Sequence, residues 1–316
     1  MPFPKAEQIW MDGEFVPWDE ATIHVLTPTL HYGYGVFEGI RAYPTDRGPA
    51  VFQLLPHMER LLRSARIYPP LDTIAWSPQE LADIACELIR VNGHDGGCYI
   101  RPTIFLSYGE IGLNPLPSEP QVAMATWEWG SYLGEESLEQ GVKVMISSYR
   151  RIGKNTIPPA GKANGQYINS SLAKVEALRA GYDEAIMLSE DGFVAEGTGE
   201  NLFVVRGETI LTPPLSDGPL GGITRDSVIQ IARDLGFEVH ESSLVRTDLF
   251  LADEVFLTGT AAELTPVREV AGYELGPRGP VTEKVQSTFI DTVRGKVDRY
   301  HDWLTYVHDR PTLGHD

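Results

Sequence analysis

Lys162 is the residue whose surroundings most suggest chemistry, because it lies among small side chains in TIPPAGKANGQYINSS, residues 156–171. Gly161 precedes it, and Ala163 and Gly165 follow it. A flexible lysine reaches water from almost any position, so an ordinary surface lysine needs no small neighbours. Small neighbours do let a planar carbonyl compound approach the amine, as Schiff-base formation requires. The segment therefore predicts either a nucleophilic lysine or a solvated one.

The other lysines occur in less distinctive settings. The chain has seven lysines. Lys174 falls within a predicted amphipathic helix and Lys154 is close to Arg150 and Arg151, and we expect both lysines to be solvated. Lys162 alone combines a loop of small residues with the start of a helix, so the rest of the sequence must decide its role.

A candidate anion site lies in GGITRDSV, residues 221–228, where two glycines lead into a predicted helix over 225–235. The first N–H groups of a helix have no partner within it and point toward any bound anion. Thr224 is placed to cap this helix and to bind a phosphate through its hydroxyl. An ordinary glycine turn with a threonine cap is the alternative. The segment is not a P-loop, because that motif's spacing and its lysine are missing.

Two carboxylates, Glu196 and Glu200, flank Gly-Thr-Gly in the stretch EGTGENLF. Carboxylates of strands usually lie on the solvent face, which is the first expectation here. A buried Glu196 would need a cationic partner to offset its desolvation. A protonated pyridine nitrogen would be such a partner.

Glycines alternate with aromatic residues in HYGYGVFEGIR, residues 31–41. This pattern indicates either backbone close to a ligand or a kinked strand. His31, Glu38 and His57 are conceivable metal ligands, but no second histidine at helical spacing supports them, and we predict no metal site. In GTAAELTP, residues 259–266, small residues after a strand leave N–H groups available for a carboxylate or phosphate.

Composition limits the class of protein. The chain has 316 residues, 42% of them apolar, which is enough for a sizeable core and two domains. Its net charge of −18 argues against nucleic-acid binding, and it means that an anion site needs gathered arginines or backbone N–H groups. Cys86 and Cys98 form no metal or disulfide pattern, so we expect a reducing, cytoplasmic setting. We expect no signal peptide and no membrane span.

Local signals predict an α+β protein. Asp12-Gly13 indicates a hairpin, and Ser77 with Glu80 indicates a capping box that opens a helix. We predict a small α/β domain over residues 1–126, a connection over 127–140, and a large α/β domain over 141–316 that carries the lysine. Further helices are expected over 54–68, 166–180 and 225–235, and strands over 98–106, 121–127 and 142–149. The helix over 166–180 has an apolar stripe of Ile168, Leu172, Val175 and Leu178. A strand meander is expected over 184–212, with turns at Asp191-Gly192 and Arg206-Gly207.

Several long motifs follow one another along the chain, among them HYGYGVFEGIRAY, CYIRP, GEIGLNP, NTIPPAGKANGQY, SEDGFVAEGTGENLF and LADEVFLTGTAAELTPV. Together they resemble the fold-type IV, or class IV, pyridoxal-phosphate-dependent aminotransferases, whose fold is D-amino-acid-aminotransferase-like. Within that family they are most similar to the branched-chain amino-acid branch. The residues that match the class pattern are Glu196, Thr198, Asn201, Phe203, Thr212 and Arg225.

The resemblance implies pyridoxal 5'-phosphate as the cofactor. Lys162 would bind it covalently and move the proton at the substrate Cα. Glu196 would pair with the pyridine nitrogen, and Tyr167 would hydrogen-bond the phenolic oxygen of the ring. The phosphate would be held by Arg60, the backbone of Ile223 and Thr224, and Thr260.

The same resemblance implies a substrate pocket with an aromatic wall for aliphatic side chains. Tyr99 would join the backbone of Thr260 and Ala261 around the α-carboxylate, and Arg101 would receive the second carboxylate of glutamate. At Tyr34 and Gly35 some relatives carry small hydroxyl residues, which leaves the preference among leucine, isoleucine and valine open. The wall residues would be Tyr32, Phe37, Gly39, Trp129 and Tyr132.

The implied reaction moves the amino group of L-leucine, L-isoleucine or L-valine to 2-oxoglutarate by a ping-pong cycle. The alternatives are a D-amino-acid or R-amine transaminase, an aminodeoxychorismate lyase, or a non-catalytic metabolite-binding homologue. The partners expected are amino acids and 2-oxo acids, with no nucleic acid and no membrane. The family resemblance also implies a homodimer or a higher even assembly such as a hexamer.

Overall fold

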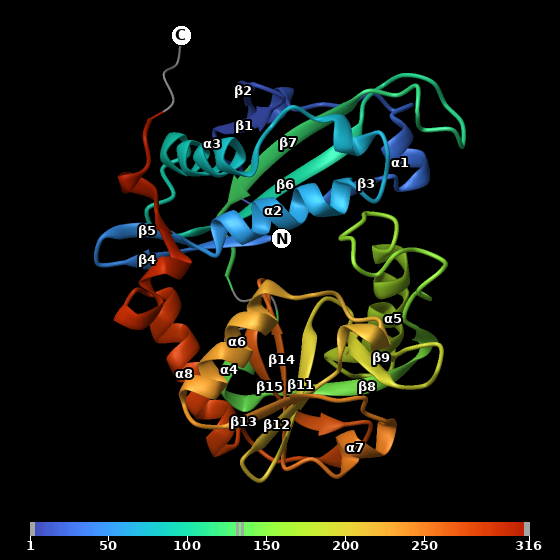
Figure 1. Cartoon of the computed structure of the whole chain (residues 1–316), viewed down its shortest axis with the longest axis vertical. Coiled ribbons are helices and arrows are strands. Elements are labelled where there is room, and N and C mark those ends of the chain that lie inside the picture. The colour runs from blue at the N-terminus through green and yellow to red at the C-terminus, as the bar shows by residue number, and fades with distance from the viewer. Residues whose placement is uncertain (1–3, 131–132, 134–135, 313–316) are drawn as a thin grey trace. The chain divides into compact units, whose positions relative to one another are not determined.

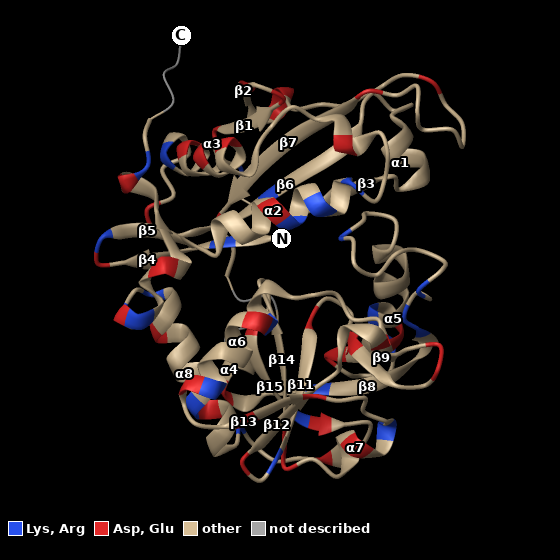
Figure 2. Cartoon of the chain, viewed as in Figure 1, with Lys and Arg blue, Asp and Glu red and all other residues tan. Residues whose placement is uncertain are grey.

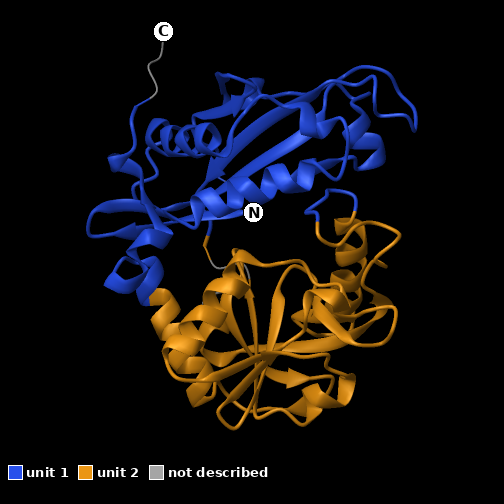
Figure 3. Ribbon diagram, viewed as in Figure 1, with its two compact units in different colours: residues 1–129, 161–165, 291–316 blue, residues 130–160, 166–290 orange. Residues whose placement is uncertain are grey.

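The computed structural model describes residues 4–130, 133 and 136–312, and it divides the chain into two compact units (Figures 1 and 3). The first unit comprises residues 1–129, 161–165 and 291–316, and the second comprises residues 130–160 and 166–290. Each unit contains its own sheet and helices, so the predicted α+β class is confirmed.

The sheet of the first unit is antiparallel, in the order β17-β5-β4-β6-β7-β1-β2, with β3 beside β6. The predicted hairpin at Asp12-Gly13 is confirmed, because β1 and β2 pair directly on either side of it. The strands are β1 (Gln8–Met11), β2 (Glu14–Pro17), β3 (Gly35–Phe37), β4 (Ile40–Thr45), β5 (Gly48–Phe52), β6 (Cys98–Leu106), β7 (Pro120–Trp127) and β17 (Leu304–Tyr306).

The helices α2 (Leu54–Ala65) and α3 (Pro78–Val91) pack on the sheet of the first unit (Figure 1). The capping box that opens α3 is confirmed: the Glu80 N–H donates to Ser77 Oγ at 3.2 Å, and the Ser77 N–H donates to Glu80 Oε2 at 2.8 Å. The short helices are α1 (Pro28–Tyr32), η1 (Trp18–Glu20), η2 (Leu71–Thr73), η4 (Asp298–Trp303) and η5 (Val307–Asp309). Fully buried side chains of the helices and strands form one core, including Leu54, Met58, Leu61, Leu81, Leu88, Ile100, Ile104 and Met124.

The second unit contains a mixed sheet in the order β10-β9-β8-β15-β14-β11-β12-β13, with β16 beside β15. The pairs β8–β9, β8–β15 and β12–β13 are parallel, and the others are antiparallel. The predicted turns at Asp191-Gly192 and Arg206-Gly207 are confirmed, and each joins a hairpin, β9 with β10 and β11 with β12. The prediction of one continuous meander is wrong, because β8, β9, β15 and β14 lie between β10 and β11 in the sheet. The strands are β8 (Val142–Arg150), β9 (Glu184–Leu188), β10 (Val194–Gly197), β11 (Asn201–Arg206), β12 (Thr209–Thr212), β13 (Glu238–Glu241), β14 (Glu254–Gly259), β15 (Glu263–Val270) and β16 (Tyr273–Glu274).

Helix α5 (Tyr167–Arg179) packs on the sheet with the opposite face to the one that its apolar pattern predicts. The small residues Ser170, Ala173 and Ala177 are buried against β8 and β9. The predicted apolar stripe remains 44–67% exposed in this chain, so that prediction is wrong. Small side chains let a helix axis approach the sheet closely, which branched side chains would prevent. The stripe consists of Ile168, Leu172, Val175 and Leu178.

The other helices of the second unit are α4 (Ser137–Gln140), α6 (Ile223–Asp234), α7 (Arg246–Phe250), η3 (Leu215–Asp217) and α8 (Pro280–Val293), the last three residues of α8 being counted with the first unit. Across the part of the chain that the structure covers, every helix is too short or too polar to cross a bilayer. Figure 2 shows acidic and basic residues together on several helices, among them α2, α3 and α8.

The two units differ from the predicted domain bounds in two segments. Residues 161–165 belong to the first unit because Ala163 forms a bridge to Val36 and the Lys162 N–H donates to Ser64 Oγ at 3.1 Å. Residues 291–316 belong there too, because β17 pairs with β5. Long-range pairing of this kind leaves no local mark in the sequence. The lysine is therefore part of the first unit.

Candidate active site

The loop that carries Lys162 lies against the glycine-rich segment before β3. The Asn164 N–H donates to the Gly35 carbonyl at 2.9 Å, and the Gly165 N–H donates to the Gly33 carbonyl at 3.0 Å. A Cβ atom on Gly33 would lie 2.7 Å from the Cα of Gly165, and Gly33 also has a left-handed φ of 66°. These two glycines are thus needed for the close approach of two backbone segments, a neighbour that the sequence pattern alone did not identify.

The main chain of Lys162 is fixed on both sides. Its N–H donates to Ser64 Oγ at 3.1 Å, and its carbonyl accepts the Phe37 N–H at 3.1 Å. Its Nζ lies 5.2 Å from the centroid of the Phe37 ring, within the range of a cation–π contact. The residue is only partly buried, so its main chain is fixed while Lys162 keeps some exposure to solvent.

Arg60, the predicted phosphate ligand, lies on α2 with its guanidinium directed at the buried carboxylate of Glu38. The distances are 2.6 Å from Nε to Oε1 and 2.8 Å from Nη2 to Oε2. His57 shares this carboxylate, whereas His31 contacts the Val25 carbonyl at 2.8 Å. No group of three or more His, Cys, Asp or Glu side chains fit to hold a metal ion occurs among residues 4–130, 133 and 136–312. Glu38 binds the guanidinium group of Arg60, and His57 contacts the same carboxylate.

The first unit brings four predicted substrate residues together. The ring of Tyr99 contacts Trp129 edge-on, with centroids 4.6 Å apart, and the Arg101 guanidinium lies 4.7 Å from the Phe37 ring centroid. Arg101 Nη2 donates to the Tyr99 hydroxyl at 3.2 Å, while its buried Nε has no hydrogen-bond partner among the described residues. Gly39 belongs to the same group, because a Cβ there would clash with that hydroxyl. The result is an aromatic wall with one arginine.

Other predicted substrate residues are not part of this group. Tyr32 ends α1, is 43% exposed and has its ring near His31. Tyr132 lies outside the described residues. Tyr34 donates to the Pro69 carbonyl at 2.8 Å and meets Tyr68 edge-on. In this unit Tyr34 therefore supports the fold near α2, and Gly35 makes room for the lysine loop.

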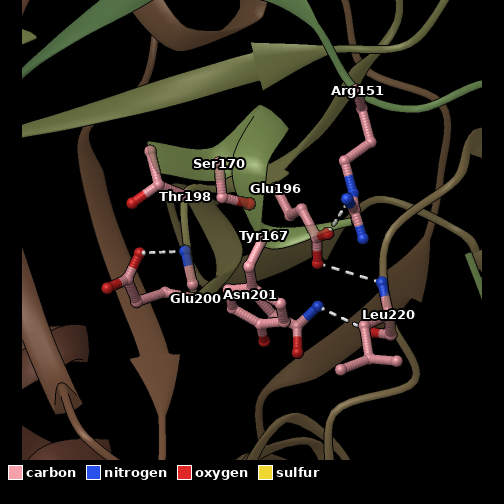
Figure 4. A pocket seen from close by; sticks show the side chains of 9 residues that line it. Arg151, Tyr167, Ser170, Glu196, Thr198, Glu200, Asn201 and Leu220 are labelled. Carbon is pink, nitrogen blue, oxygen red and sulfur yellow. Dashed lines mark hydrogen bonds and ion pairs between the residues drawn. The ribbon is translucent and has the colours of Figure 1, made fainter. Parts of the chain in front are cut away.

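The second unit contains a pocket built around Glu196 (Figure 4). Oε1 of Glu196 lies 2.5 Å from Arg151 Nε, and Oε2 accepts the Leu220 N–H at 2.9 Å. The carboxylate is buried, so the solvent-face expectation for it is wrong. Tyr167, the first residue of α5, lines the same pocket. The lining residues are Arg151, Tyr167, Ser170, Glu196, Thr198, Gly199, Glu200, Asn201 and Leu220.

Arg151 is a site residue that the sequence did not assign. Its side chain is 4% exposed and provides the cationic partner that a buried Glu196 requires. It follows β8 directly, and β8 runs parallel to β9, which in turn pairs with β10 and its Glu196. The pair Arg150 and Arg151 at the end of a strand in an acidic chain is the sequence signal that could have indicated this residue. The sequence did not say which carboxylate it would meet.

Glu200 is the second buried carboxyl group of the pocket, contrary to the solvent-face expectation. Burial raises the pKa of Glu200 to about 8, and the negative charge of Glu184 adds to the effect. Its Oε2 accepts the Gly199 N–H at 3.1 Å. Lys174 pairs with the fully buried Glu184 at 2.7 Å, so its predicted solvation is wrong. Glu200 is thus largely protonated at neutral pH, in the pocket that Glu196 and Arg151 also line.

We expect Glu200 to make stability depend on pH. The ordinary pKa of glutamate is 4.5, so between pH 4.5 and 8 the folded chain binds a proton there that the unfolded chain does not. Stability from this group is therefore present below that window and lost as pH rises through it, by up to ~1.4 kcal/mol per pH unit. Glu200→Gln removes this pH dependence. In chemical denaturation, the free energy of unfolding of Glu200→Gln relative to that of the wild type should therefore increase from pH 5.5 to 7.5.

Glu80→Gln is the matched control for this experiment. Hydrogen bonds from Ser77 lower the pKa of the exposed Glu80, so it stays ionised throughout that window. Its stability difference from the wild type should be flat between pH 5.5 and 7.5. If the free energies of unfolding of Glu200→Gln and the wild type changed with pH in parallel, Glu200 would not be protonated in this range.

The predicted phosphate residues of the second unit lie at two backbone turns. Ile223 and Thr224 occupy the first turn of α6, after Gly222 at the cap position. Thr224 does not cap the helix, because α6 begins two residues earlier than predicted. A Cβ on Gly222 would clash with Asn201 Oδ1, and Asn201 Nδ2 donates to the Leu220 carbonyl at 2.9 Å. Thr260 and Ala261 form the turn between β14 and β15.

Comparison with known proteins identifies the class of enzyme. The family described as amino-transferase class IV matches residues 35–270, which is most of the chain. The chain belongs to this family, and it is an aminotransferase. It is 45% identical over 307 residues to the branched-chain-amino-acid aminotransferase of Salmonella typhimurium, covering 96% of this chain and 98% of that enzyme.

Solved structures agree with this assignment. The crystal structure of the Escherichia coli branched-chain amino acid aminotransferase matches with a TM-score of 0.93 and 46% identity, over 96% of this chain and 100% of that one. The branched-chain aminotransferase of the thermophilic archaeon Thermoproteus uzoniensis, solved with norvaline, matches with a TM-score of 0.92 and 45% identity, over 96% of this chain and 100% of that one. The predicted fold-type IV architecture is confirmed.

Class IV aminotransferases use pyridoxal 5'-phosphate, and the residues of this chain fit that group. The pocket of the second unit offers a carboxylate for a pyridine N–H and a phenol for the ring oxygen. A Cβ on Gly199 would meet no atom within 4 Å, so this side of the pocket is open. Arg151 Nη1 is buried there without a hydrogen-bond partner in the described part of the chain. A polar aromatic ligand matches these features.

Proposed function

We propose that this chain catalyses transamination between branched-chain L-amino acids and 2-oxoglutarate with pyridoxal 5'-phosphate. The observation that carries the substrate assignment is the group formed by Phe37, Tyr99, Trp129 and Arg101. Its rings favour an aliphatic side chain, and the unpartnered Nε of Arg101 suits a carboxylate. Such a pocket accepts both leucine and glutamate, because a hydrated arginine can remain when an apolar group binds. The names of the relatives from Salmonella typhimurium and Escherichia coli support the same choice.

The residues of this chain divide the chemistry as follows. When bound, the cofactor supplies an electron-withdrawing ring that weakens the bond between the substrate Cα and its proton. Lys162 binds the cofactor covalently through Nζ and moves that proton. Glu196 keeps a negative charge at the pyridine nitrogen, with Arg151 and the Leu220 N–H fixing both of its oxygens. Tyr167 donates to the ring oxygen.

The phosphate and carboxylate groups need their own donors. We assign the phosphate to Arg60, to the N–H groups of Ile223 and Thr224 at the start of α6, and to Thr260. A helix start provides N–H groups and a partial positive charge, which favour a dianion. We assign the α-carboxylate to the Tyr99 hydroxyl and to the turn of Thr260 and Ala261. Backbone donors suit this role, because the net charge of −18 otherwise repels anions.

We expect the protein to convert L-leucine, L-isoleucine and L-valine in the presence of 2-oxoglutarate, and to leave D-alanine unchanged. The measurement is formation of L-glutamate with each amino donor in turn. Turnover of D-alanine alone would indicate a D-amino-acid transaminase, and turnover of an R-amine alone would indicate an amine transaminase. A protein inert with every donor and unable to bind the cofactor would overturn the proposed enzyme function.

We also propose that the chain works in the cytoplasm as a homodimer or a higher even assembly such as a hexamer. Both cysteines, Cys86 and Cys98, are free and buried, which agrees with a reducing compartment. The relative from Salmonella typhimurium, 45% identical to this chain, is a bacterial enzyme whose name gives it a small-molecule substrate. Sedimentation of the purified protein determines the number of subunits.

A further inference from the structure

Glu38 is a buried carboxylate whose two oxygens are both used by one face of α2. It is 0% exposed, and it sits between Phe37, which contacts the lysine, and Gly39. Oε1 accepts Arg60 Nε at 2.6 Å, and Oε2 accepts Arg60 Nη2 at 2.8 Å. This forked arrangement fixes both the plane and the direction of a guanidinium group. Glu38 therefore restricts Arg60 to one orientation.

His57 completes the contact. Its Nδ1 lies 2.8 Å from Glu38 Oε2, and the ring is 1% exposed. Burial lowers the pKa of His57. The hydrogen bond and charge of Glu38 act against this effect, the positive charges of Arg60 and Lys162 act with it, and the net shift is downward. The imidazole is thus neutral at neutral pH, and because a carboxylate only accepts, Nδ1 must carry the proton. His57 donates to Glu38 without adding a charge.

The ionisation of Glu38 follows from these partners. Burial alone would raise the pKa of Glu38, but the charge of Arg60 and the hydrogen bonds from Arg60 and His57 overcome it and lower the pKa well below its ordinary value. Arg60 and Glu38 together are neutral, which limits the cost of burying them. The pair would attract a dianion less than a lone arginine. Its advantage is orientation, because an arginine buried without this fork could turn away from a ligand.

The same face of α2 also holds the lysine loop. Ser64 lies one turn after Arg60 on the helix, and its Oγ accepts the Lys162 N–H at 3.1 Å. The Phe37 N–H, next to Glu38 in the chain, donates to the Lys162 carbonyl at 3.1 Å. Arg60 and Lys162 are thus fixed to one rigid set of contacts within the first unit.

We propose that Glu38, supported by His57, is a positioning residue that orients Arg60 for the phosphate group of the cofactor. The inference rests on the proposed function, in which Arg60 is a phosphate ligand. Glu38 touches neither the cofactor nor the substrate in this scheme. Its effect should therefore depend on whether the ligand carries a phosphate.

The test measures binding of pyridoxal 5'-phosphate and of pyridoxal to the apoprotein by tryptophan fluorescence. In Glu38→Gln an NH₂ group replaces one oxygen and faces an N–H of Arg60 or His57. We expect affinity for pyridoxal 5'-phosphate to fall about 10-fold or more, since a hydrogen bond to a charged group is lost. Affinity for pyridoxal, which carries no phosphate, should stay close to that of the wild type. Arg60→Gln shows how far the affinity for pyridoxal 5'-phosphate falls when the arginine is removed completely.

Glu87→Gln is the matched control, because Glu87 also forms a buried ion pair with an arginine, Arg90, within α3 of the same unit. It should leave both affinities unchanged. If thermal melting shows that Glu38→Gln is not folded, His57→Leu is tested in its place. We expect it to lose affinity for the phosphorylated ligand selectively, but by a smaller factor.

Three outcomes are decisive. Wild-type affinity of a folded Glu38→Gln protein for pyridoxal 5'-phosphate would overturn the positioning role, and so would an equal loss for both ligands, which a merely structural role produces. The proposed function would still stand in both cases. Failure of the wild type to bind pyridoxal 5'-phosphate would instead overturn the proposed function.

Discussion

Lys162→Ala should lower the transaminase kcat by about 10⁴-fold or more, because one side chain provides both the covalent anchor and the proton transfer. The main-chain contacts of residue 162, to Ser64 Oγ and the Phe37 N–H, do not involve the lost amine. The variant should therefore fold normally and lose chemistry alone. The measurement is kcat with L-leucine and 2-oxoglutarate, together with borohydride reduction of the cofactor-loaded protein and peptide mass analysis. Wild-type protein should gain the cofactor mass at Lys162.

Lys154→Ala is the control for this experiment. Lys154 is on the same stretch of chain, but its side chain is 54% exposed and lies 3.8 Å from Asp191. Surface ion pairs of this kind contribute little, so kcat and melting temperature should match the wild type. Substantial activity of Lys162→Ala, or reduction of the cofactor onto another lysine, would show that the catalytic amine had been assigned to the wrong residue.

The second large effect is expected at Glu196. Glu196→Gln keeps the size of the side chain but removes the negative charge that we assign to the pyridine nitrogen. Loss of one electrostatic stabiliser of this kind costs about 10²–10³-fold in kcat. Covalent attachment at Lys162 should persist, because that step does not need the carboxylate. The measurement is kcat with L-leucine, compared with cofactor content after borohydride reduction.

Glu200→Gln separates charge from packing in the same pocket. Both glutamates line it, and both are buried. Because burial raises the pKa of Glu200 to about 8, its neutral glutamine analogue has nearly the same shape and charge at pH 7. Its kcat should stay close to the wild-type value. An equal fall in both variants would mean that the pocket responds to any change, and that Glu196 has no special role.

Elements with local signals were predictable from the sequence. The Asp12-Gly13 hairpin, the capping box at Ser77 and the turn at Arg206-Gly207 are each decided by a few neighbouring residues, and the structure has all three. Local preference also located α6, although Thr224 proved to lie inside the helix. The apolar pattern of α5 predicted the wrong buried face, because its apolar stripe is exposed and its small residues face the sheet. Periodicity shows that a helix has two faces, and packing decides which face is buried.

The family motifs identified more of the candidate site than local sequence signals could. Small neighbours only permitted a reactive Lys162, and the ordered set of motifs, confirmed by the family match over residues 35–270, identified the class of enzyme. Roles of single residues, such as Arg60 for phosphate and Glu196 for the pyridine nitrogen, remain proposals that the variants above test.

The sequence by itself determined the family and the α+β class and led to our proposal for Lys162, because these depend on residue types and short spacings. Only the tertiary structure decided that Arg151 meets Glu196, that Glu38 and His57 serve Arg60, and that Glu200 is buried. Each of these contacts joins segments distant in the chain, brought together by strand pairing or helix packing. Charge partners chosen in this way have no local signature, since any arginine in the sequence could in principle meet any carboxylate.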